Sequence, residues 1–408
     1  MAGPLVTTME AKERIAWAEE IERHLFGHIL PFWAGPAVDR EAGGFHGWLS
    51  VTGEPDPARP RGLVQNTRIL WTFAAVTDLR QEAEFHALAD RALEWVRDRF
   101  WDADHGGGYW HLDRSGRVRN DTKQVYGQAF GVYALAQYHL AFGAPEVLDR
   151  ARSWYRTVDS RARDAGHGGY GEAFVRDWSR PAPSLVGGSE LGAAKSMNTH
   201  LHVLEAWATL YRAWPDEDLR RRVRELLELF LDKIVDPSTH HLRAFFRPDW
   251  QPVGEASYTY GHDIEAAWLL CEAAETLGEP DLKRRVERTA VQMAGAVLAE
   301  AMAPDGGVAY EGRDGKVTRT DRDWWVQAEA LVGFLHAWRL TGHERFLQAA
   351  RRVWEFIQTR VADPVHGDWF WRVNEQGQPD RSLPKSSEWK APYHSARACL
   401  EAIRRLRD

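Results

Sequence analysis

The segment DADHGGGYWHLDRSGRV at residues 102–118, followed by DTKQVYGQAFGVYALAQYHLAF at residues 121–142, contains the pattern that decides the fold. An aspartate opens a glycine-rich turn, and short aromatic or β-branched runs then lie on both sides of a second polar turn. Such alternation, bounded by Gly, Asp and Asn, predicts a short β-hairpin. In the second stretch apolar residues recur at helical spacing, which predicts a helix.

The same unit recurs six times, with hairpin segments that begin at Asp39, Asp102, Asp164, Asp236, Pro304 and Asp363. Between the hairpins the helical pattern predicts about twelve helices. We place them near residues 9–32, 64–80, 82–101, 122–142, 145–163, 197–213, 215–235, 261–277, 279–301, 322–341, 343–361 and 391–407. Short breaks such as Trp214-Pro215 join the helices into pairs.

Six helix pairs can stack as an open solenoid or close into a toroid. The helix after each hairpin is apolar on most faces, whereas its partner carries charge, as in DLRRRVRELLELFLDK at residues 218–233. This asymmetry favours an inner ring of helices wrapped by an outer ring. We therefore predict an all-α fold, an (α/α)6 barrel in which residues 1–408 form a single catalytic domain, with short β-hairpins at the active-site end.

The composition of the 408 residues narrows the class of partner. A net charge of −7 gives no basic surface for nucleic acid, and charges interrupt every long apolar stretch, so no membrane span is expected. Twenty Trp residues suit either an aromatic core or a surface that stacks on polyhydroxylated ligands. The N-terminus lacks a signal-peptide pattern, and Cys271 and Cys399 read as buried thiols. We expect a cytoplasmic protein, a monomer or weak homo-oligomer.

In a closed barrel of this kind the inner helices begin at one end, under the hairpins. Ionisable and aromatic residues gather at those expected starts, among them three histidines on different helices, His202, His262 and His394. Helix N-termini add partial positive charge, which suits an oxyanion or enediolate that develops during a reaction. The histidines therefore predict proton-transfer chemistry in one shared pocket.

The expected helix at residues 197–213 offers both His200 and His202, which point to nearly opposite faces. Asn198, His202 and Glu205 share one face by their spacing. We therefore expect His202 to line the pocket, and His200 to pack behind it or against a hairpin.

His262 and Glu265, at positions i and i+3, have two interpretations. They could bind a metal, but no second tight ligand pair appears in the sequence. We favour a carboxylate that orients the imidazole and raises its basicity, and we expect no metal and no cofactor.

Aromatic and basic residues at the other starts suit a sugar ligand. Trp325 and Trp389 lie beside ionisable residues, which favours sugar-stacking platforms over plain core positions. Arg68 is either a buried structural ion-pair partner or a clamp on a hydroxyl or carbonyl group of the substrate.

Five motifs carry a resemblance to a known family, namely NTRILWTFAA, MNTHLHVLEAW, GHDIEAAWLL, WWVQAEALVGF and WKAPYHSARACLEA. They resemble the N-acylglucosamine 2-epimerase superfamily over essentially the whole chain, and within it the cellobiose 2-epimerase family most. The resemblance implies an (α/α)6 barrel that works without metal or organic cofactor, with His262 and His394 as the acid/base pair at C2 of a sugar and His202 holding the open-chain substrate. It also implies that the sugar is contacted by Arg68, Asn198, Glu265, Trp325 and Trp389, and more weakly by Tyr126 and Glu190.

The implied reaction interconverts glucose and mannose units at the reducing end of β-1,4-linked disaccharides. Ala391 and Ser395 depart from the residues common in the family, and because they flank His394 they leave the substrate preference open. A D-mannose isomerase or a monosaccharide 2-epimerase of the same superfamily is the alternative. A glycoside hydrolase would need two carboxylates from Asp263, Glu265 and Glu329, and a pocket rich in histidine suits it poorly.

Overall fold

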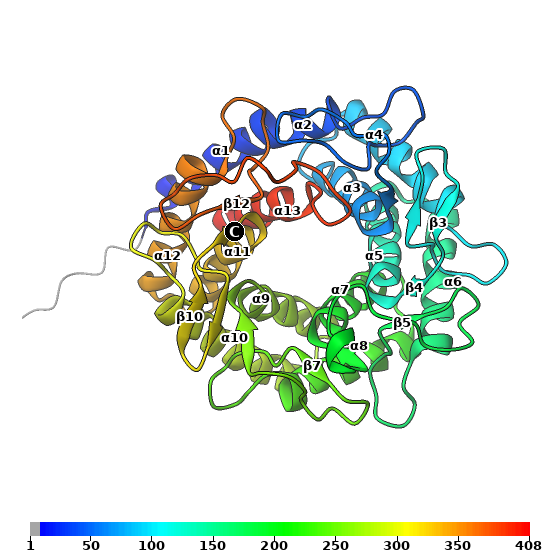
Figure 1. Cartoon of the computed structure of the whole chain (residues 1–408). Coiled ribbons are helices and arrows are strands. Elements are labelled where there is room, and N and C mark those ends of the chain that lie inside the picture. Colours follow the sequence, from blue (N-terminus) through cyan, green and yellow to red (C-terminus); the bar gives the residue numbers. More distant parts are fainter. Residues whose placement is uncertain (1–8) are drawn as a thin grey trace, which may run out of the picture.

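The computed structural model describes residues 9–408, so the part of the predicted domain and of the N-terminal segment that falls on residues 1–8 lies outside the described residues. The helices form two concentric rings (Figure 1). The inner ring consists of α3 (Leu63–Val76), α5 (Val125–Phe142), α7 (Met197–Ala213), α9 (Tyr260–Leu277), α11 (Trp324–Thr341) and α13 (Tyr393–Arg407). The outer ring consists of α1 (Ala11–His24), α2 (Leu30–Ala34), α4 (Ala83–Glu94), α6 (Pro145–Ala162), α8 (Glu217–Leu229), α10 (Pro280–Glu300) and α12 (Glu344–Phe356).

Helix contacts close the inner ring. Each inner helix packs against the next one along the chain, and the last, α13, packs against both α11 and α3. The red C-terminal helix therefore lies beside the blue N-terminal part of the chain in Figure 1. The predicted (α/α)6 barrel is confirmed as a closed toroid.

Burial separates the two rings in the way the sequence pattern predicts. Every residue of α3 is buried, whereas α8 buries Leu219, Val223, Leu226 and Leu227, which form a single stripe. A helix that is apolar on all faces needs neighbours on all sides, and an amphipathic helix needs only one. The inner ring is thus the core of the molecule, and the outer ring shields it from solvent.

Local sequence signals set the ends of the helix pairs. The inner helices α5 and α9 end at Gly143 and Gly278, whose φ angles of 65° and 68° require a left-handed conformation. Pro145 and Pro280 then begin the outer partners α6 and α10. Four outer helices contain a five-residue π-helical segment where the sequence predicted continuous α-helix. Three of these segments, η2 (Trp95–Arg99), η4 (Phe230–Ile234) and η5 (Ile357–Val361), end their helices, and η1 (Leu25–Ile29) joins α1 to α2.

The six predicted hairpin turns are present, each closed by one backbone bridge: Val38–Phe45, Trp101–Gly108, Arg163–Tyr170, Val235–Leu242, Met302–Val308 and Ala362–Trp369. Further pairing connects neighbouring repeats, because the strand before an inner helix joins the hairpin of the following repeat. These antiparallel pairs are β1 (Arg61–Gly62) with β2 (His111–Leu112), β4 (Lys123–Gln124) with β5 (Ala173–Phe174), β6 (Lys195–Ser196) with β7 (Phe245–Phe246), β8 (Ser257–Thr259) with β9 (Glu311–Arg313), and β11 (Arg322–Asp323) with β12 (Arg372–Val373).

Other backbone pairs extend the hairpins at this end of the barrel. β3 (Val118–Asn120) pairs with β2, and β10 (Lys316–Arg319) with β9. A bridge between Leu49 and Ser386 joins the sixth repeat to the first. The 3-10 helix η3 (Ser189–Leu191) lies in the loop before β6. These strand pairs therefore link neighbouring repeats over the starts of the inner helices.

Within residues 9–408 no helix is both long and apolar enough to cross a membrane. Cys271 and Cys399 are buried free thiols, as the sequence predicted.

Candidate active site

The first turns of the inner helices meet under the hairpins, and the sequence-predicted residues lie there. α3 carries Arg68, α5 carries Tyr126, α7 carries Asn198 and His202, α9 carries His262 and Glu265, α11 carries Trp325, and α13 carries His394. Trp389 lies in the loop that leads into α13. All of these side chains are buried or half-buried. The described part of the chain thus brings residues more than 300 positions apart into one site, since Arg68 donates a hydrogen bond to the Trp389 carbonyl oxygen (2.7 Å).

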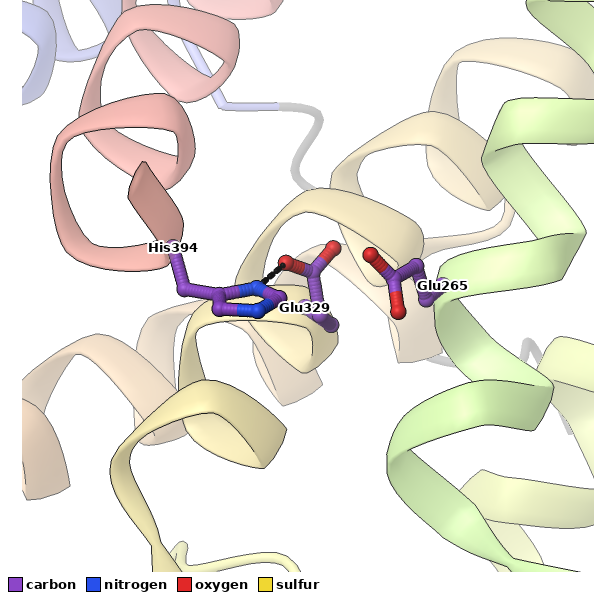
Figure 2. A group of neighbouring side chains, drawn as sticks. All are labelled: Glu265, Glu329 and His394. Carbon is purple, nitrogen blue, oxygen red and sulfur yellow. Dashed lines mark hydrogen bonds and ion pairs between the residues drawn. The ribbon is translucent and has the colours of Figure 1, made fainter. Parts of the chain in front are cut away.

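His394 is held by a carboxylate from the neighbouring helix. Its Nδ1 lies 2.6 Å from Glu329 Oε1 on α11, and Figure 2 shows the imidazole edge turned toward Glu329, with Glu265 of α9 beyond it. The two Glu329 oxygens already accept hydrogen bonds from Arg397 (2.7 Å) and Trp268 (3.1 Å). Nδ1 of His394 is therefore the donor, which leaves its Nε2 free to act as a base.

Burial keeps this imidazole neutral. It holds the pKa of His394 well below the ordinary value, and the positive charges of Arg68 and Arg397 lower it further. The carboxyl of Glu329 has a raised pKa, because burial outweighs the effect of Arg397. A neutral imidazole with a fixed tautomer is what a general base requires.

His262 has a different partner from the one the sequence predicted. The spacing suggested that Glu265 orients it, but its Nδ1 contacts the hydroxyl of Thr259 (2.5 Å), while Glu265 accepts a hydrogen bond from Arg397. A buried carboxylate gains more from a guanidinium than from a neutral imidazole, so Arg397 takes it. That part of the prediction was wrong.

Burial also keeps His262 neutral, lowering its pKa to about 3. The ring of Trp325 lies beside both of the expected acid/base residues, with its centroid 4.7 Å from that of His262 and 5.9 Å from that of His394. Two neutral imidazoles from non-consecutive inner helices therefore border one indole ring.

The two histidines of α7 separate as their spacing predicted. His202 Nδ1 lies 2.9 Å from Glu205 Oε2, and its ring centroid lies 5.0 Å from that of Tyr126 and 4.9 Å from that of Phe130. His200 turns the other way and accepts the Tyr170 N–H of a hairpin (2.9 Å). Burial lowers the pKa of His202, although Glu205 opposes the shift.

Arg68 connects the site to a group of three aromatic rings, Trp110, Tyr126 and Trp389, which we call the aromatic edge. Besides its bond to the Trp389 carbonyl, it donates to the Tyr126 hydroxyl (2.8 Å). The Trp389 ring packs near Trp110 and Tyr126, at centroid distances of 5.7 and 6.2 Å. At the start of α7, Asn198 Oδ1 is buried and has no hydrogen-bond partner among residues 9–408. A buried acceptor in this position can take a donor from a ligand.

Arg397 is the functional residue that sequence reasoning missed. One turn deeper than His394, its buried guanidinium donates to Glu205, Glu265 and Glu329. It outweighs burial at Glu205, together with His202 and Tyr393, and lowers the pKa of that carboxyl to about 2. Burial and the charge of Glu329 instead leave the pKa of Glu265 well above its ordinary value. The one available signal was the i+3 spacing from His394.

Three donors at this point have the chemistry of a metal site, because atoms of Glu265, Glu329 and His394 lie within 4.8 Å of one another. The guanidinium of Arg397 already binds both carboxylates. The two carboxylates therefore already share an internal cation. Glu190, in contrast, is exposed in η3.

Comparisons with known proteins agree with this geometry. A family model for N-acylglucosamine 2-epimerase matches residues 43–398. The chain is 39% identical to a cellobiose 2-epimerase of Bacteroides fragilis over 390 residues, which covers 94% of this chain and 98% of that protein. It superimposes on a cellobiose 2-epimerase from Bacillus thermoamylovorans with a TM-score of 0.91 at 36% identity, over 96% of this chain and 99% of that one. A D-mannose isomerase of Thermobifida fusca is 27% identical, with 89% of each chain covered.

Proposed function

The chain belongs to the N-acylglucosamine 2-epimerase family, and we propose that it is an isomerase that interconverts glucose and mannose units at the reducing end of β-1,4-linked disaccharides such as cellobiose. The observation that carries the proposal is the pair of neutral imidazoles, His262 and His394, both of which lie next to the Trp325 ring. Epimerisation at C2 needs a base on one face of the carbon and an acid on the other. Two histidines from different helices can supply these groups.

We infer the following course of reaction. The sugar ring opens, and Nε2 of one histidine takes the C2 proton, which leaves an enediolate. We assign the binding of the charged oxygens to Arg68 and His202, which lie near the starts of α3 and α7. Once the enediolate has formed, the other histidine takes up a proton from solvent and returns it to the opposite face of C2, while the first histidine releases the C2 proton to solvent. His394, whose tautomer is set by Glu329, acts on one face, and His262 acts on the other.

The aromatic edge of the site favours a disaccharide. The Trp389 ring lies beside those of Trp110 and Tyr126, where a second sugar ring can stack. The stronger similarity to cellobiose 2-epimerase than to D-mannose isomerase, 39% against 27% identity, supports the same choice. Asn198 and Glu265 complete the contacts that we assign to the reacting sugar.

Product analysis tests the function directly. We expect the enzyme to convert cellobiose to glucosyl-mannose, and to act more slowly on mannose or glucose alone. Ketose as the main early product would instead identify an aldose–ketose isomerase. Free glucose would identify a hydrolase, although the bonds from Arg397 to all three site glutamates leave no free carboxylate pair for that chemistry.

A deuterium label separates the two isomerase mechanisms. With two independent bases, the proton removed from C2 is not the proton returned, so substrate deuterated at C2 should give an epimer without the label in ordinary water. An isomerase with one base would carry part of the label to C1 of a ketose. Epimer that retains deuterium at C2 would contradict the two-base mechanism.

We further propose that the reaction needs no metal or cofactor, because Arg397 already supplies the cation between Glu265 and Glu329. Dialysis against a strong chelator should leave kcat unchanged; a loss that one divalent ion restores would overturn this. We also expect a cytoplasmic enzyme, a monomer or weak homo-oligomer in one catalytic domain, with no nucleic-acid or membrane partner, in keeping with its net charge of −7.

A further inference from the structure

One position shared by the six hairpin turns is occupied differently in two of them, and this difference indicates a specific role. This position is the residue directly before the second member of each closing bridge. Four repeats have glycine there, and two do not: the residues are Gly44, Gly107, Gly169, His241, Gly307 and Asp368. The two exceptions belong to the hairpins that precede α9 and α13, the helices that carry His262 and His394.

Both exceptional side chains reach the residue that directly follows an acid/base histidine. His241 Nδ1 lies 2.7 Å from Asp263 Oδ2, next to His262. Asp368 Oδ1 accepts a hydrogen bond from Ser395 Oγ (3.1 Å), next to His394. His241 and Asp263 are 2% and 0% exposed, and Asp368 and Ser395 are 0% and 1% exposed. The two contacts are therefore fully internal.

In two of the repeats that have glycine at the shared position, a helix side chain contacts the hairpin turn. It leaves no room for a side chain at that position. A Cβ atom on Gly107 would lie 2.7 Å from Gln128 Oε1, and one on Gly169 would lie 2.6 Å from His200 Nε2. In α9 and α13 the helix residue is shorter, Asp263 or Ser395, and the hairpin side chain fills the space. Exchange of volume explains the packing, but it does not explain why both replacements are ionisable.

The charged contacts are costly, which indicates that a defined geometry is being maintained. Asp368 adopts φ of 50°, a left-handed conformation that glycine adopts freely and aspartate only occasionally. It forms an ion pair of 2.8 Å with Lys390, and both side chains are 0% exposed. Burying such a pair has a large desolvation cost. Lys390 lies only four residues before His394, so the pair ties the start of α13 to its hairpin turn.

We propose that His241 and Asp368 are positioning residues, which hold the first turns of α9 and α13 so that His262 and His394 keep the alignment needed for proton transfer at C2. The proposal rests on the proposed function for the identity of the reaction. Its geometric part, the orientation of the two imidazoles, can be measured without turnover.

A matched pair of substitutions in the sixth hairpin tests Asp368. Asp363 also accepts a bond from a fully buried lysine, Lys385 (2.8 Å, both 0% exposed), but its contacts hold the turn itself. Asp368→Asn and Asp363→Asn should lower Tm to a similar extent. Only Asp368→Asn should lower kcat on cellobiose, by about 10- to 100-fold, with KM changed less than about twofold, because a small displacement of a base slows proton transfer. Equal kcat losses in both variants, or none in Asp368→Asn, would overturn the proposal.

The fourth repeat allows the same comparison. His241 Nε2 also lies 3.2 Å from Glu300 Oε1. Glu300→Gln therefore alters the contact at Nε2 and leaves the contact between Nδ1 and Asp263 in place. We expect His241→Gln to lower kcat about tenfold and Glu300→Gln to leave it within about twofold of wild type. The reverse order of effects would show that His241 serves the hairpin rather than His262.

A spectroscopic measurement separates a failure of this proposal from a failure of the proposed function. The ¹⁵N imidazole resonances of His394 should shift in Asp368→Asn and remain unchanged in Asp363→Asn, whether or not the wild type epimerises cellobiose. Unchanged resonances in both variants would reject the positioning role. If Asp368→Asn does not fold, Ser395→Ala removes the same hydrogen bond more mildly, and the same shift and a smaller loss of kcat are expected from it.

Discussion

The two halves of the inner ring contribute different chemistry to the site. The half formed by α9, α11 and α13 carries the proposed acid/base histidines, both neutral because they are buried and both next to the Trp325 ring. The half formed by α3, α5 and α7 carries His202 and the hydrogen-bonded pair of Arg68 and Tyr126. Proton transfer and binding of negative charge are thus assigned to opposite halves.

Arg397 makes this division possible, although it lies on α13. It binds one glutamate of the α3–α5–α7 half, Glu205, and two of the other half. Each half also has a carboxylate that backs a histidine: Glu329 for His394 and Glu205 for His202. The same motif therefore serves a base in one half and a binding group in the other, and substitutions can distinguish them.

Removal of the acid/base histidines should have the largest effect. His394→Ala and His262→Ala should each lower kcat by at least about 10³-fold while the variants remain folded, because loss of either group stops proton transfer on one face of C2. Steady-state kinetics on cellobiose, with circular dichroism as a control for folding, provide the test. A variant that kept more than about a tenth of the wild-type kcat, a barrier change below about 1.4 kcal/mol, would remove that histidine from the mechanism.

The two backing carboxylates offer the next largest contrast. Glu329→Gln should lower kcat about 10²- to 10³-fold, because an amide can hold the wrong tautomer of His394. Glu205→Gln should lower kcat less than about tenfold and mainly raise KM, since in the proposed mechanism His202 binds the substrate and does not transfer the C2 proton. Equal effects on kcat in the two variants would show that the halves share one role. Thr259→Val removes the hydrogen-bond partner of His262, and its loss of kcat should lie between those of Glu329→Gln and Glu205→Gln.

The fold could be predicted from the sequence in more detail than the site. The range 197–213 predicted for α7 coincides with the observed helix, Met197–Ala213, because apolar periodicity and flanking turn residues are local signals. The strands that join neighbouring repeats are mostly two to four residues long, and such short segments carry no periodic pattern. The π-helical segments of four outer helices left no signal in the sequence either.

Within the site, positions could be predicted but partners could not. Helix spacing correctly separated His202 from His200, because a face is a property of one helix. The pairing of His262 with Glu265 failed because a residue from another helix, Arg397, competes for the carboxylate. In the sequence Arg397 resembles the arginines near the end of α13, such as Arg404 and Arg407, which are exposed. Only the closure of the ring shows that it is buried.

Substitution of the two tryptophans should affect disaccharide and monosaccharide substrates differently. Trp389→Ala should lower kcat/KM for cellobiose about tenfold and for mannose much less, because its ring lies near Trp110 and Tyr126, where a non-reacting sugar can stack. Trp325→Ala should lower kcat/KM for both sugars equally, since this ring borders both acid/base histidines. Equal losses in Trp389→Ala would assign that ring to the reacting sugar or to packing.

The smallest expected effect is the response of activity to mild acid. Burial lowers the pKa of His262 to about 3 and holds that of His394 well below its ordinary value. Both bases therefore stay neutral when the pH falls from 8 to 6, and kcat/KM should change less than about twofold. A solvent-exposed histidine with a pKa near 6.5 would lose about fourfold over the same range.

Stability should respond to acid before activity does. In the unfolded chain these histidines bind protons near pH 6.5, whereas in the folded protein they do not, so stability present above pH 6.5 is lost as the pH falls below it. Tm should therefore decline between pH 6.5 and 4 while kcat/KM, measured below Tm, persists.

Arg68→Met sharpens the comparison, because Arg68 is a cation of the binding half that lowers the pKa of His394. Its removal should move the acid limb of the kcat/KM profile to higher pH; an unchanged limb would mean that the two halves do not interact electrostatically.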